Sequence, residues 1–286
     1  QRVDQVFSEF LPELVFHAAA HKHVPMMEIN PCEAVKNNVA GTATVTKAAE
    51  RWGVKRFILI STDKAVNPSS VMGATKRIGE LILRVRGGRS ATRFAAVRFG
   101  NVLGSNGSVL PRFLEQIRAG GPVTVTHPEI RRFFMLIPEA VQLVLHAAAL
   151  GEPDVVYVLE MGEQIKLVEM ARNIIRCAGF IPEKEIRIAY IGLRPGEKLY
   201  EELIGPHEVA EPSPVPKVLR VRGTPDYDTA TLELQIERLM LLAERGDGTG
   251  VVHQLRRLVP TFNPQRESTT ASVEGQTTAL AEVSQM

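Results

Sequence analysis

The stretch FILISTDKAVNPSSVMGATK, residues 57–76, decides the fold of this 286-residue chain. Its first four residues, 57–60, are apolar and predict a short buried strand, and a polar run, residues 61–64, begins where that strand ends. A turn containing Pro68 follows, and the pattern over residues 73–86 predicts an amphipathic helix. A strand, a polar turn and a helix in this order are typical of one unit of a parallel sheet.

The flanking segments extend this unit into an alternating pattern. Short apolar strands are expected at residues 14–16 and 93–99, and a helix is expected over residues 33–51. Continuously apolar strands separated by helices predict a parallel sheet covered on both faces, because the connecting helices must pack there. We therefore predict a doubly wound α/β fold for residues 1–108. Residues just beyond each strand are then the candidates for a ligand site.

From residue 109 onward the predicted elements are shorter and more mixed. Helices are expected at residues 109–119, 139–150, 167–179, 231–245 and after Pro195, and strands at residues 123–126, 132–136, 155–159 and 186–191. We interpret residues 109–263 as a smaller substrate-binding lobe with elements that return to the core, including an extended Pro-rich stretch at residues 206–225. Residues 264–286 are rich in Ser, Thr, Glu and Gln and predict a disordered tail.

Composition and charge narrow the class of protein. Apolar residues make up 44% and charged residues 23% of the chain, which excludes fibrous and disulfide-scaffold classes. The two cysteines, Cys32 and Cys177, fit a reducing, cytoplasmic compartment, and no apolar run approaches the roughly 18 residues of a membrane span. Residues 1–150 carry 19 Lys and Arg against 11 Asp and Glu. This half is expected to bind a small phosphorylated ligand, since no nucleic-acid-binding module is recognised.

Six segments, in order, resemble the extended short-chain dehydrogenase/reductase superfamily and, within it, the nucleotide-sugar 4,6-dehydratases of bacterial polysaccharide biosynthesis. They are HAAAHKHVPMMEINP (17–31), NNVAGT (37–42), STDKAVNPSSVMGATK (61–76), RFGNVLGSNGSV (98–109), HPEIRRFFM (127–135) and RPGEKLYEEL (194–203). The resemblance implies a Rossmann-like fold, a UDP-sugar substrate, and NAD or NADP that stays bound and is recycled. We also expect a homo-oligomer.

One departure from the family pattern concerns the residue four positions before the helix lysine, Lys76. Members usually carry Tyr there, but this chain carries Met72. That feature resembles a branch of large, membrane-anchored UDP-N-acetylglucosamine 4,6-dehydratases, whose location would be the cytoplasmic face of the inner membrane. A thioether has no proton to exchange, so Met72 cannot be the base for the sugar 4-hydroxyl. We expect Lys76 to hold the nicotinamide ribose and to favour loss of that proton.

The resemblance implies a reaction in three steps. A hydride leaves C4 of the sugar for NAD⁺, water is eliminated across C5 and C6, and the hydride returns to C6. By this analogy Lys64 takes the C5 proton, Asp63 protonates the departing 6-hydroxyl, and Thr62 relays a proton near O4. Lys64 would have to be neutral and Asp63 protonated, and their adjacency opposes both demands.

The resemblance also implies residues that bind the cofactor and the substrate. For the cofactor they are His17, Ala18, Ala19, Ala20, Asn38, Ser61 and Lys76, and for the substrate Lys22, His23, Asn101, Ser108, Arg112, Arg132, Arg194 and Glu197. The three arginines are candidate diphosphate ligands, because a guanidinium fork suits phosphate oxygens, and Glu197 would accept the uridine ribose hydroxyls. Ordinary packing or surface roles remain alternatives for the alanines, Asn38 and the arginines. His21 and His23 lack a third ligand nearby, so no metal site is expected.

The glycine-rich turn G-x-G-x-x-G, which seats a dinucleotide pyrophosphate, does not occur in the sequence. In the family it precedes the His-Ala-Ala-Ala segment, so we expect the first βαβ unit, and any membrane anchor, upstream of Gln1. This chain alone is then expected to bind NAD poorly. Two other functions stay open. A nucleotide-sugar C4 epimerase needs the 4-ketone but no acid and base at C5 and C6, and a non-catalytic remnant would only bind a nucleotide sugar.

Overall fold

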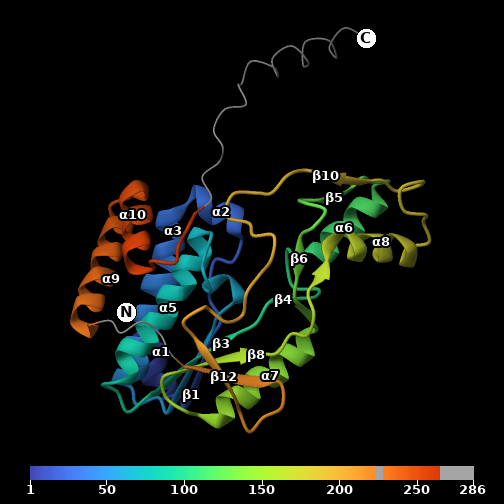
Figure 1. Ribbon diagram of the computed structural model, residues 1–286. Coiled ribbons are helices and arrows are strands. Elements are labelled where there is room, and N and C mark those ends of the chain that lie inside the picture. The colour runs from blue at the N-terminus through green and yellow to red at the C-terminus, as the bar shows by residue number, and fades with distance from the viewer. Residues whose placement is uncertain (223–227, 265–286) are drawn as a thin grey trace.

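The computed structural model describes residues 1–222 and 228–264 (Figure 1), so the tail expected over residues 264–286 lies outside the described residues apart from Pro264. At its centre is a six-stranded sheet in the order β1-β2-β3-β8-β12-β11. The strands are β1 (Leu14–His17), β2 (Arg56–Ile60), β3 (Arg93–Arg98), β8 (Val155–Leu159), β12 (Val218–Arg222) and β11 (Val209–Pro212). The first four run parallel, and the last two form an antiparallel edge. The predicted parallel α/β sheet is confirmed.

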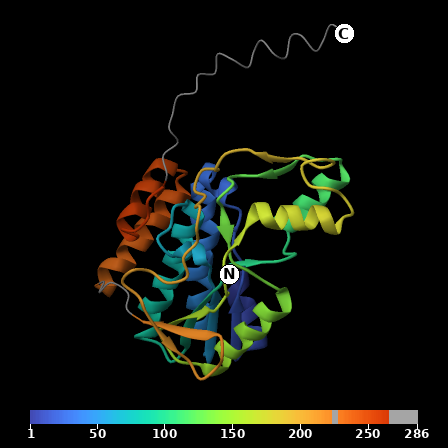
Figure 2. The ribbon, with the colours of Figure 1, turned by 45° about the vertical axis from the view of Figure 1, so that its right-hand side comes forward.

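Helices cover both faces of this sheet (Figure 2). One face is covered by α1 (Arg2–Phe10), α4 (Gly41–Arg51) and α5 (Val71–Gly87), and the other by α7 (Ile137–Leu150). Side chains of a strand alternate between faces, and β2 shows the consequence. Phe57 and Leu59 pack with the α1–α4–α5 layer, whereas Ile58 packs with residues of α7. A continuously apolar strand is therefore what this two-sided burial requires.

The helix expected over residues 33–51 forms in three joined pieces. They are α3 (Pro31–Ala34), the π-helical segment η1 (Val35–Ala40) and α4. A π-helical turn is wider than an α-helical turn and often occurs at functional sites. Here it carries Asn38, whose side chain is buried against the loop that follows β1.

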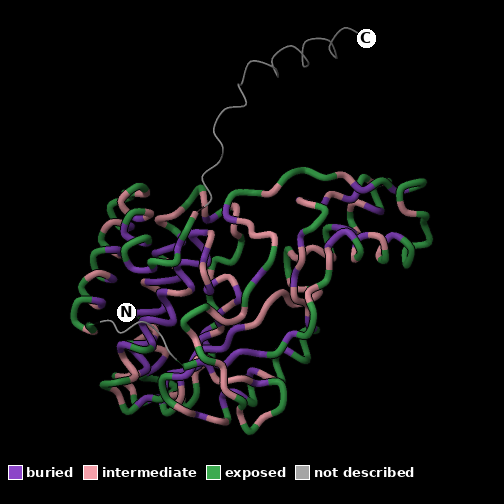
Figure 3. Tube along the Cα trace, viewed as in Figure 1, coloured by how far each residue is buried: buried purple, intermediate pink, exposed green. Residues whose placement is uncertain are grey.

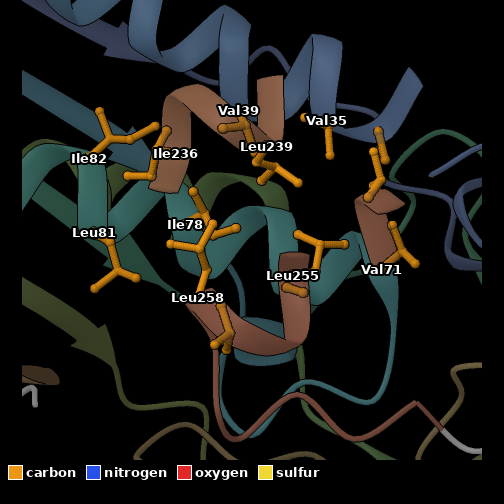
Figure 4. Close-up of a cluster of buried hydrophobic side chains, with 14 of the residues drawn as sticks. Val35, Val39, Val71, Ile78, Leu81, Ile82, Ile236, Leu239, Leu255 and Leu258 are labelled. Carbon is orange, nitrogen blue, oxygen red and sulfur yellow. The ribbon is translucent and has the colours of Figure 1, made fainter. Parts of the chain in front are cut away.

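The last described part of the chain is a helical pair that packs on the outside of α5. The sequence predicts α9 (Thr229–Glu244) but misses α10 (Gly248–Leu258), because its first turn, Gly-Thr-Gly, is made of poor helix formers. The Asp247 carboxylate accepts a hydrogen bond of 2.8 Å from the Gly250 N–H and caps α10. Figure 4 shows Ile236, Leu239 and Leu255 of this pair meeting side chains of η1 and α5.

A smaller lobe lies beyond the carboxyl ends of the parallel strands (Figure 1). It contains α6 (Val109–Arg118), β5 (Val123–Val125), α8 (Leu167–Cys177) and β10 (Ile188–Tyr190), with its own apolar core. Figure 3 shows buried residues along the central sheet and its helices, and a separate buried group in the lobe. The strand expected at residues 132–136 is split in two: β6 (Arg131–Arg132) pairs with β9 (Ile165–Lys166), and β7 (Phe134–Met135) pairs with β4 (Asn101–Val102).

The helix expected after Pro195 does not form, so this prediction is wrong. Residues 194–208 pass through turns and bends, and α2 (Val24–Ile29), which the sequence did not predict, lies against this segment at Gly196. Gly196 has φ +75°, which is left-handed backbone, and the Leu199 carbonyl accepts a hydrogen bond of 2.9 Å from the Arg131 N–H. The segment is therefore held by contacts with residues outside it, and not by the backbone hydrogen bonds of a helix. Of the Pro-rich stretch expected to be extended over residues 206–225, residues 209–212 and 218–222 are extended, residues 214–217 form a bend and a turn, and residues 223–225 lie outside the described residues.

Among the residues that the structure describes, no helix combines the length and the apolar character that crossing a membrane requires.

Candidate active site

A cavity of about 470 Å³ opens between the carboxyl ends of β1–β3 and the smaller lobe. Its volume lies in the range of small-molecule sites, roughly 300–1,000 Å³. Most of the residues predicted from the sequence line it: Ala18, Ala20, Lys22, His23, Ser61, Thr62, Lys64, Met72, Lys76, Asn101, Ser108, Arg112, Arg132, Arg194 and Glu197. The cavity therefore brings the predicted cofactor, catalytic and substrate residues together.

Four predicted residues, His17, Ala19, Asn38 and Asp63, do not line the cavity. His17 is buried, and its Nε2 donates to the Thr42 hydroxyl, 3.0 Å away, because that hydroxyl already donates its own proton to the Asn38 carbonyl. Burial, aided by the charge of Lys76, lowers the pKa of His17 to about 4, so the ring is neutral at neutral pH. His17, the last residue of β1, thus links the end of this strand to the Thr42 hydroxyl on α4.

Asn38 braces the loop that follows β1. Its Oδ1 accepts from the His21 N–H (2.7 Å), and its Nδ2 donates to the His21 carbonyl (3.1 Å) and to Thr75 on α5 (3.0 Å). Asn38 therefore braces this loop through hydrogen bonds and does not itself line the cavity. It keeps Ala18 and Ala20, two small side chains, at the cavity surface.

Around Lys64 lies a group of ionisable and polar side chains that we call the Lys64 cluster: Thr62, Asp63, Lys64, Asn101 and Glu201. The Lys64 ammonium donates to Asp63 Oδ1 (3.0 Å) and Asn101 Oδ1 (3.1 Å), and lies 3.7 Å from Glu201 Oε1. The Thr62 hydroxyl also donates to Asp63 Oδ1 (2.8 Å). The second oxygens of Asp63 and Glu201 are buried and have no hydrogen-bond partner among the described residues.

The electrostatics of this cluster favour a charged lysine. Burial alone would lower the pKa of Lys64, but the Asp63 and Glu201 carboxylates outweigh it and raise the pKa above its usual value. Burial raises the pKa of the Glu201 carboxyl, with Lys64 opposing the rise and Asp63 adding to it. Lys64 is therefore an ammonium in this structure, and Glu201 is a carboxyl group of increased basicity.

Asp63 lies beneath the cavity surface rather than on it. Its side chain is fully buried, and a Cβ added to Gly100 would lie 3.0 Å from Asp63 Oδ2 and 2.8 Å from the Cβ of Phe133. Glycine at position 100 thus lets the backbone close over the carboxylate. Asp63 could therefore act on a ligand in the cavity only indirectly, through its hydrogen bonds to Thr62 and Lys64.

The first turns of α5 carry Met72 and Lys76 into the same cavity. Ser70 caps the helix by accepting from the Gly73 N–H (3.1 Å), and a Cβ on Gly73 would lie 2.2 Å from the Lys64 carbonyl oxygen. Gly73 therefore permits the contact between α5 and the loop after β2. The Lys76 ammonium donates to the Ile60 carbonyl (2.6 Å), and burial, opposed by Glu80, lowers the pKa of Lys76 to about 8.

Below the cavity lies a second charged group, the Arg98 network: Ser61, Arg77, Glu80, Arg98 and Glu208. The Arg98 guanidinium is fully buried and binds both Glu80 oxygens (2.7 and 2.6 Å) and both Glu208 oxygens (2.9 and 2.6 Å). Ser61, at the cavity floor, donates to Glu80 Oε1 (2.7 Å). The network ties the end of β2 to β3, α5 and the segment that precedes β11.

Three of the residues expected to bind the substrate, Arg132, Arg194 and Ser108, also line the cavity. Arg132 is buried and lies 3.5 Å from Glu197 and 3.7 Å from Glu201, so its charge is already shared with the protein. Arg194 is the more exposed arginine and lies 3.7 Å from Glu197. The Ser108 hydroxyl is buried without a hydrogen-bond partner within the described part of the chain.

Sequence reasoning missed Glu201 and Thr126. Both line the cavity, both are about 5% exposed or less, and each has an unpartnered buried oxygen among the described residues. Glu201 belongs to the quoted segment RPGEKLYEEL, which was expected to be helical, and its sequence position next to Glu202 does not distinguish the two residues. No group of three or more potential metal ligands occurs in the described parts of the chain.

A parallel sheet with a ligand cavity beyond its carboxyl edge is typical of proteins with a doubly wound, Rossmann-like fold. Residues 1–223 match the family described as polysaccharide biosynthesis protein, and the chain belongs to that family. It is 52% identical over 241 residues to the capsular polysaccharide biosynthesis protein CapD of Staphylococcus aureus, covering 84% of this chain and 40% of CapD. To the probable polysaccharide biosynthesis protein EpsC of Bacillus subtilis it is 49% identical over 274 residues, covering 94% and 44%. The chain thus spans less than half the length of these curated relatives.

Epimerases and dehydratases also resemble the chain. It is 37% identical over 202 residues to a UDP-glucose 4-epimerase of Rickettsia bellii, covering 70% of this chain and 58% of the epimerase. Among solved structures, Pen from Bacillus thuringiensis superposes with TM-score 0.69 at 35% identity, covering 78% of this chain and 70% of Pen. The dTDP-glucose 4,6-dehydratase DesIV of Streptomyces venezuelae, solved with NAD, superposes with TM-score 0.63 at 19% identity, covering 71% and 68%, and shows the fold alone. The chain thus belongs to the polysaccharide biosynthesis family and is similar in sequence to a UDP-glucose 4-epimerase.

Proposed function

We propose that the cavity belongs to an NAD-dependent nucleotide-sugar 4,6-dehydratase acting on UDP-N-acetylglucosamine, in the synthesis of a bacterial surface polysaccharide. The observation that carries this proposal is the Lys64 cluster. Elimination of water across C5 and C6 needs a base and an acid near one another, in addition to the groups that act at C4. The cluster supplies an ammonium and a carboxyl group at the surface of the same cavity that holds Lys76.

The described residues fit the nicotinamide end of NAD. Ala18 and Ala20 leave room for a flat ring beyond β1, and Ser61 and Lys76 offer a hydroxyl and an ammonium to a ribose. When bound, NAD would supply the oxidation at C4 and the reduction at C6. The residues of this chain would hold the sugar, exclude water and move its protons. Because the pKa of Lys76 is about 8, this side chain can gain or lose a proton near neutral pH when the 4-hydroxyl group of the sugar loses its own proton.

The sugar diphosphate is assigned to the lobe side of the cavity. Arg194 and Arg112 carry exposed guanidinium groups there, and the Ser108 hydroxyl lies at the start of α6. Arg132 is held by Glu197 and Glu201, so we expect it to orient these carboxylates as well as to offset the charge of the diphosphate. We therefore propose that the nucleotide lies on the lobe side of the cavity and the sugar ring next to the Lys64 cluster.

A UDP-sugar 4-epimerase is the second candidate, and the similarity to UDP-glucose 4-epimerase favours it. An epimerase needs oxidation and reduction at C4 but leaves C5 and C6 unchanged. The Lys64 cluster would then have no chemical role, and its buried, incompletely paired carboxyl groups would be an unexplained cost to stability. We therefore favour the dehydratase.

Product mass separates the two candidates. The full-length protein, supplied with NAD and UDP-N-acetylglucosamine, is expected to give a product lighter by one water. An isomer of unchanged mass would support the epimerase, and sugar binding without turnover would support a non-catalytic remnant. Lys64→Ala is expected to lower water loss by about 10²-fold or more, because Lys64 lies in the reacting cluster. Unchanged water loss in Lys64→Ala would contradict the role of the cluster.

A further inference from the structure

The extended segment from β6 to β7 separates two hollows that lie on its opposite faces. Successive residues of an extended chain point to alternate faces, and residues 131–134 follow this rule. Arg132 and Phe134 line the cavity, whereas Arg131 and Phe133 line an open groove of about 620 Å³ on the other face. The remaining residues that line the groove are Gly162, Glu163, Gln164 and Tyr200.

We propose that this groove is a second binding site, for a nucleotide whose phosphate groups lie at Arg131 and whose base lies against the Tyr200 ring. The site is separate from the cavity, because the two hollows have no lining residue in common. Binding in the groove would be additional to the proposed function and does not depend on it.

Arg131 supplies a cation for the phosphate groups. Its Nε is buried and has no hydrogen-bond partner among the described residues. The nearby Glu129 carboxylate pairs with Lys166 instead, at 2.8 Å. Lys166 is the residue directly opposite Arg131 in the β6–β9 pair, so two cations share this face of the strands. A buried guanidinium nitrogen without a partner costs stability, and a phosphate oxygen would provide the missing acceptor.

The other lining residues supply groups that suit a nucleoside. The Tyr200 side chain is 49% exposed, and Phe133 is partly buried in the same groove. Exposed aromatic rings are surfaces on which nucleobases stack. Glu163 is exposed at the groove, and a carboxylate is a common acceptor for ribose hydroxyls in nucleotide sites. A cation, an aromatic surface and a carboxylate thus correspond to the three parts of a nucleotide.

Backbone hydrogen bonds hold the wall of the groove in place. The Arg131 N–H donates to the Leu199 carbonyl (2.9 Å). The Gln164 side chain donates to the Glu201 carbonyl (2.9 Å) and accepts from the Glu201 N–H (3.4 Å). Tyr200 therefore lies between two anchored residues, which keeps its ring at the groove before any ligand arrives. Since Arg131 contributes only its backbone to this wall, its side chain can be replaced without breaking these bonds.

The test places a fluorescent reporter in the groove. Tyr200→Trp keeps an aromatic ring at this position, and the full-length protein that carries it is titrated with UDP. The signal is the difference in emission from the same protein with Tyr200. UDP is expected to change this emission, because the base stacks on the new ring. Uridine, which lacks the phosphates, is expected to bind about tenfold more weakly or less tightly still.

Two further substitutions in the reporter protein distinguish the groove from the cavity and from the general surface charge. Arg131→Gln is expected to weaken the binding of UDP by about tenfold or more, because it removes the cation and keeps the backbone bond to Leu199. Arg194→Gln removes a cation that lines the cavity, and Arg172→Gln removes an exposed arginine that pairs with Glu169. Both are expected to leave the emission change and its midpoint as they are.

An emission that does not respond to UDP overturns the second site. So does a response that persists unweakened in Arg131→Gln, a response that Arg194→Gln abolishes, or equal affinities for UDP and uridine. If Tyr200→Trp does not fold, calorimetry on the protein with Tyr200 replaces the reporter. UDP should then occupy one more site per chain in the wild type than in Arg131→Gln, and equal numbers of sites would contradict the proposal.

Discussion

The Arg98 network and the Lys64 cluster are both buried groups in which cations meet two carboxyl groups, but they differ in how completely those groups are paired. In the Arg98 network every oxygen of Glu80 and Glu208 accepts at least two hydrogen bonds or ion-pair contacts. In the Lys64 cluster one oxygen of Asp63 and one of Glu201 accept none from the described residues. The Arg98 network reaches the cavity only through Ser61, whereas Thr62, Lys64, Asn101 and Glu201 of the Lys64 cluster all line it.

The difference separates a structural from a reactive group. A fully paired network holds its members in one protonation state, as the lowered pKa values of Glu80 and Glu208 illustrate, since the arginines overcome the effect of burial. An incompletely paired group keeps a free acceptor and a carboxyl group of raised pKa, and both suit proton transfer. Incomplete pairing costs stability, and such costs concentrate at functional sites.

Removing the centre of the Arg98 network is expected to have the largest effect on stability. Arg98→Met leaves Glu80 and Glu208 buried with too few cations, which should lower the free energy of unfolding by about 3–5 kcal/mol. Urea unfolding followed by circular dichroism measures this. Arg172→Met, which removes an exposed pair with Glu169, should change it by about 0.5 kcal/mol or less. Equal effects in the two variants would contradict the structural role of Arg98.

The link between the network and the cavity floor is the Ser61 hydroxyl, and its removal should have an intermediate effect. Ser61→Ala deletes one hydrogen bond to a charged acceptor, at a cost of about 1.5–3 kcal/mol, while Arg98 still pairs with Glu80. The same unfolding assay applies. A loss as large as that of Arg98→Met would mean that Ser61, and not the arginine, holds the network together.

Glu201→Gln is expected to have the smallest effect on stability. The difference in the free energy of unfolding between this variant and the wild type should change with pH. The pKa of Glu201 is raised above its usual value of 4.5, so the unfolded state loses this proton first, and the contribution of Glu201 to stability falls as pH rises from 4.5 through its folded pKa. The variant should therefore gain stability relative to the wild type over that range.

Glu80 provides the opposite case and the control for this comparison. Its pKa is lowered, so its stabilising contribution is present above pH 4.5 and disappears as pH falls below that value. Glu80→Gln should therefore lose the most stability relative to the wild type at neutral pH. Parallel pH profiles for the two variants would contradict the distinction between the two groups.

The sequence predicts the parallel sheet well because strands such as residues 57–60 are apolar on both faces and the helices between them are amphipathic. It also predicts most of the cavity, since polar residues after parallel strands meet at one edge of the sheet. Residues 194–208 escaped prediction because their conformation is set by distant partners, including the bond from Arg131 to Leu199. The burial of Glu201 at the cavity depends on that same conformation.

The sequence also did not predict which charged residues are buried. Glu80 and Arg98 are charged residues on a helix and a strand, and their pairing depends on Glu208, which lies 110 residues from Arg98 along the chain. Asp63 follows Thr62 directly, and only the closure of Gly100 and Phe133 over it separates it from the cavity. Sequence spacing locates such residues at the edge of the sheet but does not distinguish the floor of a cavity from its surface.

One measurement tests the central claim that the Lys64 cluster carries out an elimination at C5 and C6. The full-length protein is incubated with NAD and UDP-N-acetylglucosamine in deuterated water, and the product is examined by NMR and mass spectrometry. The predicted result is a 4-keto-6-deoxy sugar with deuterium at C5, because the side chain that takes the C5 proton exchanges it with the solvent. A product that keeps its 6-hydroxyl and carries no deuterium at C5 would contradict the claim.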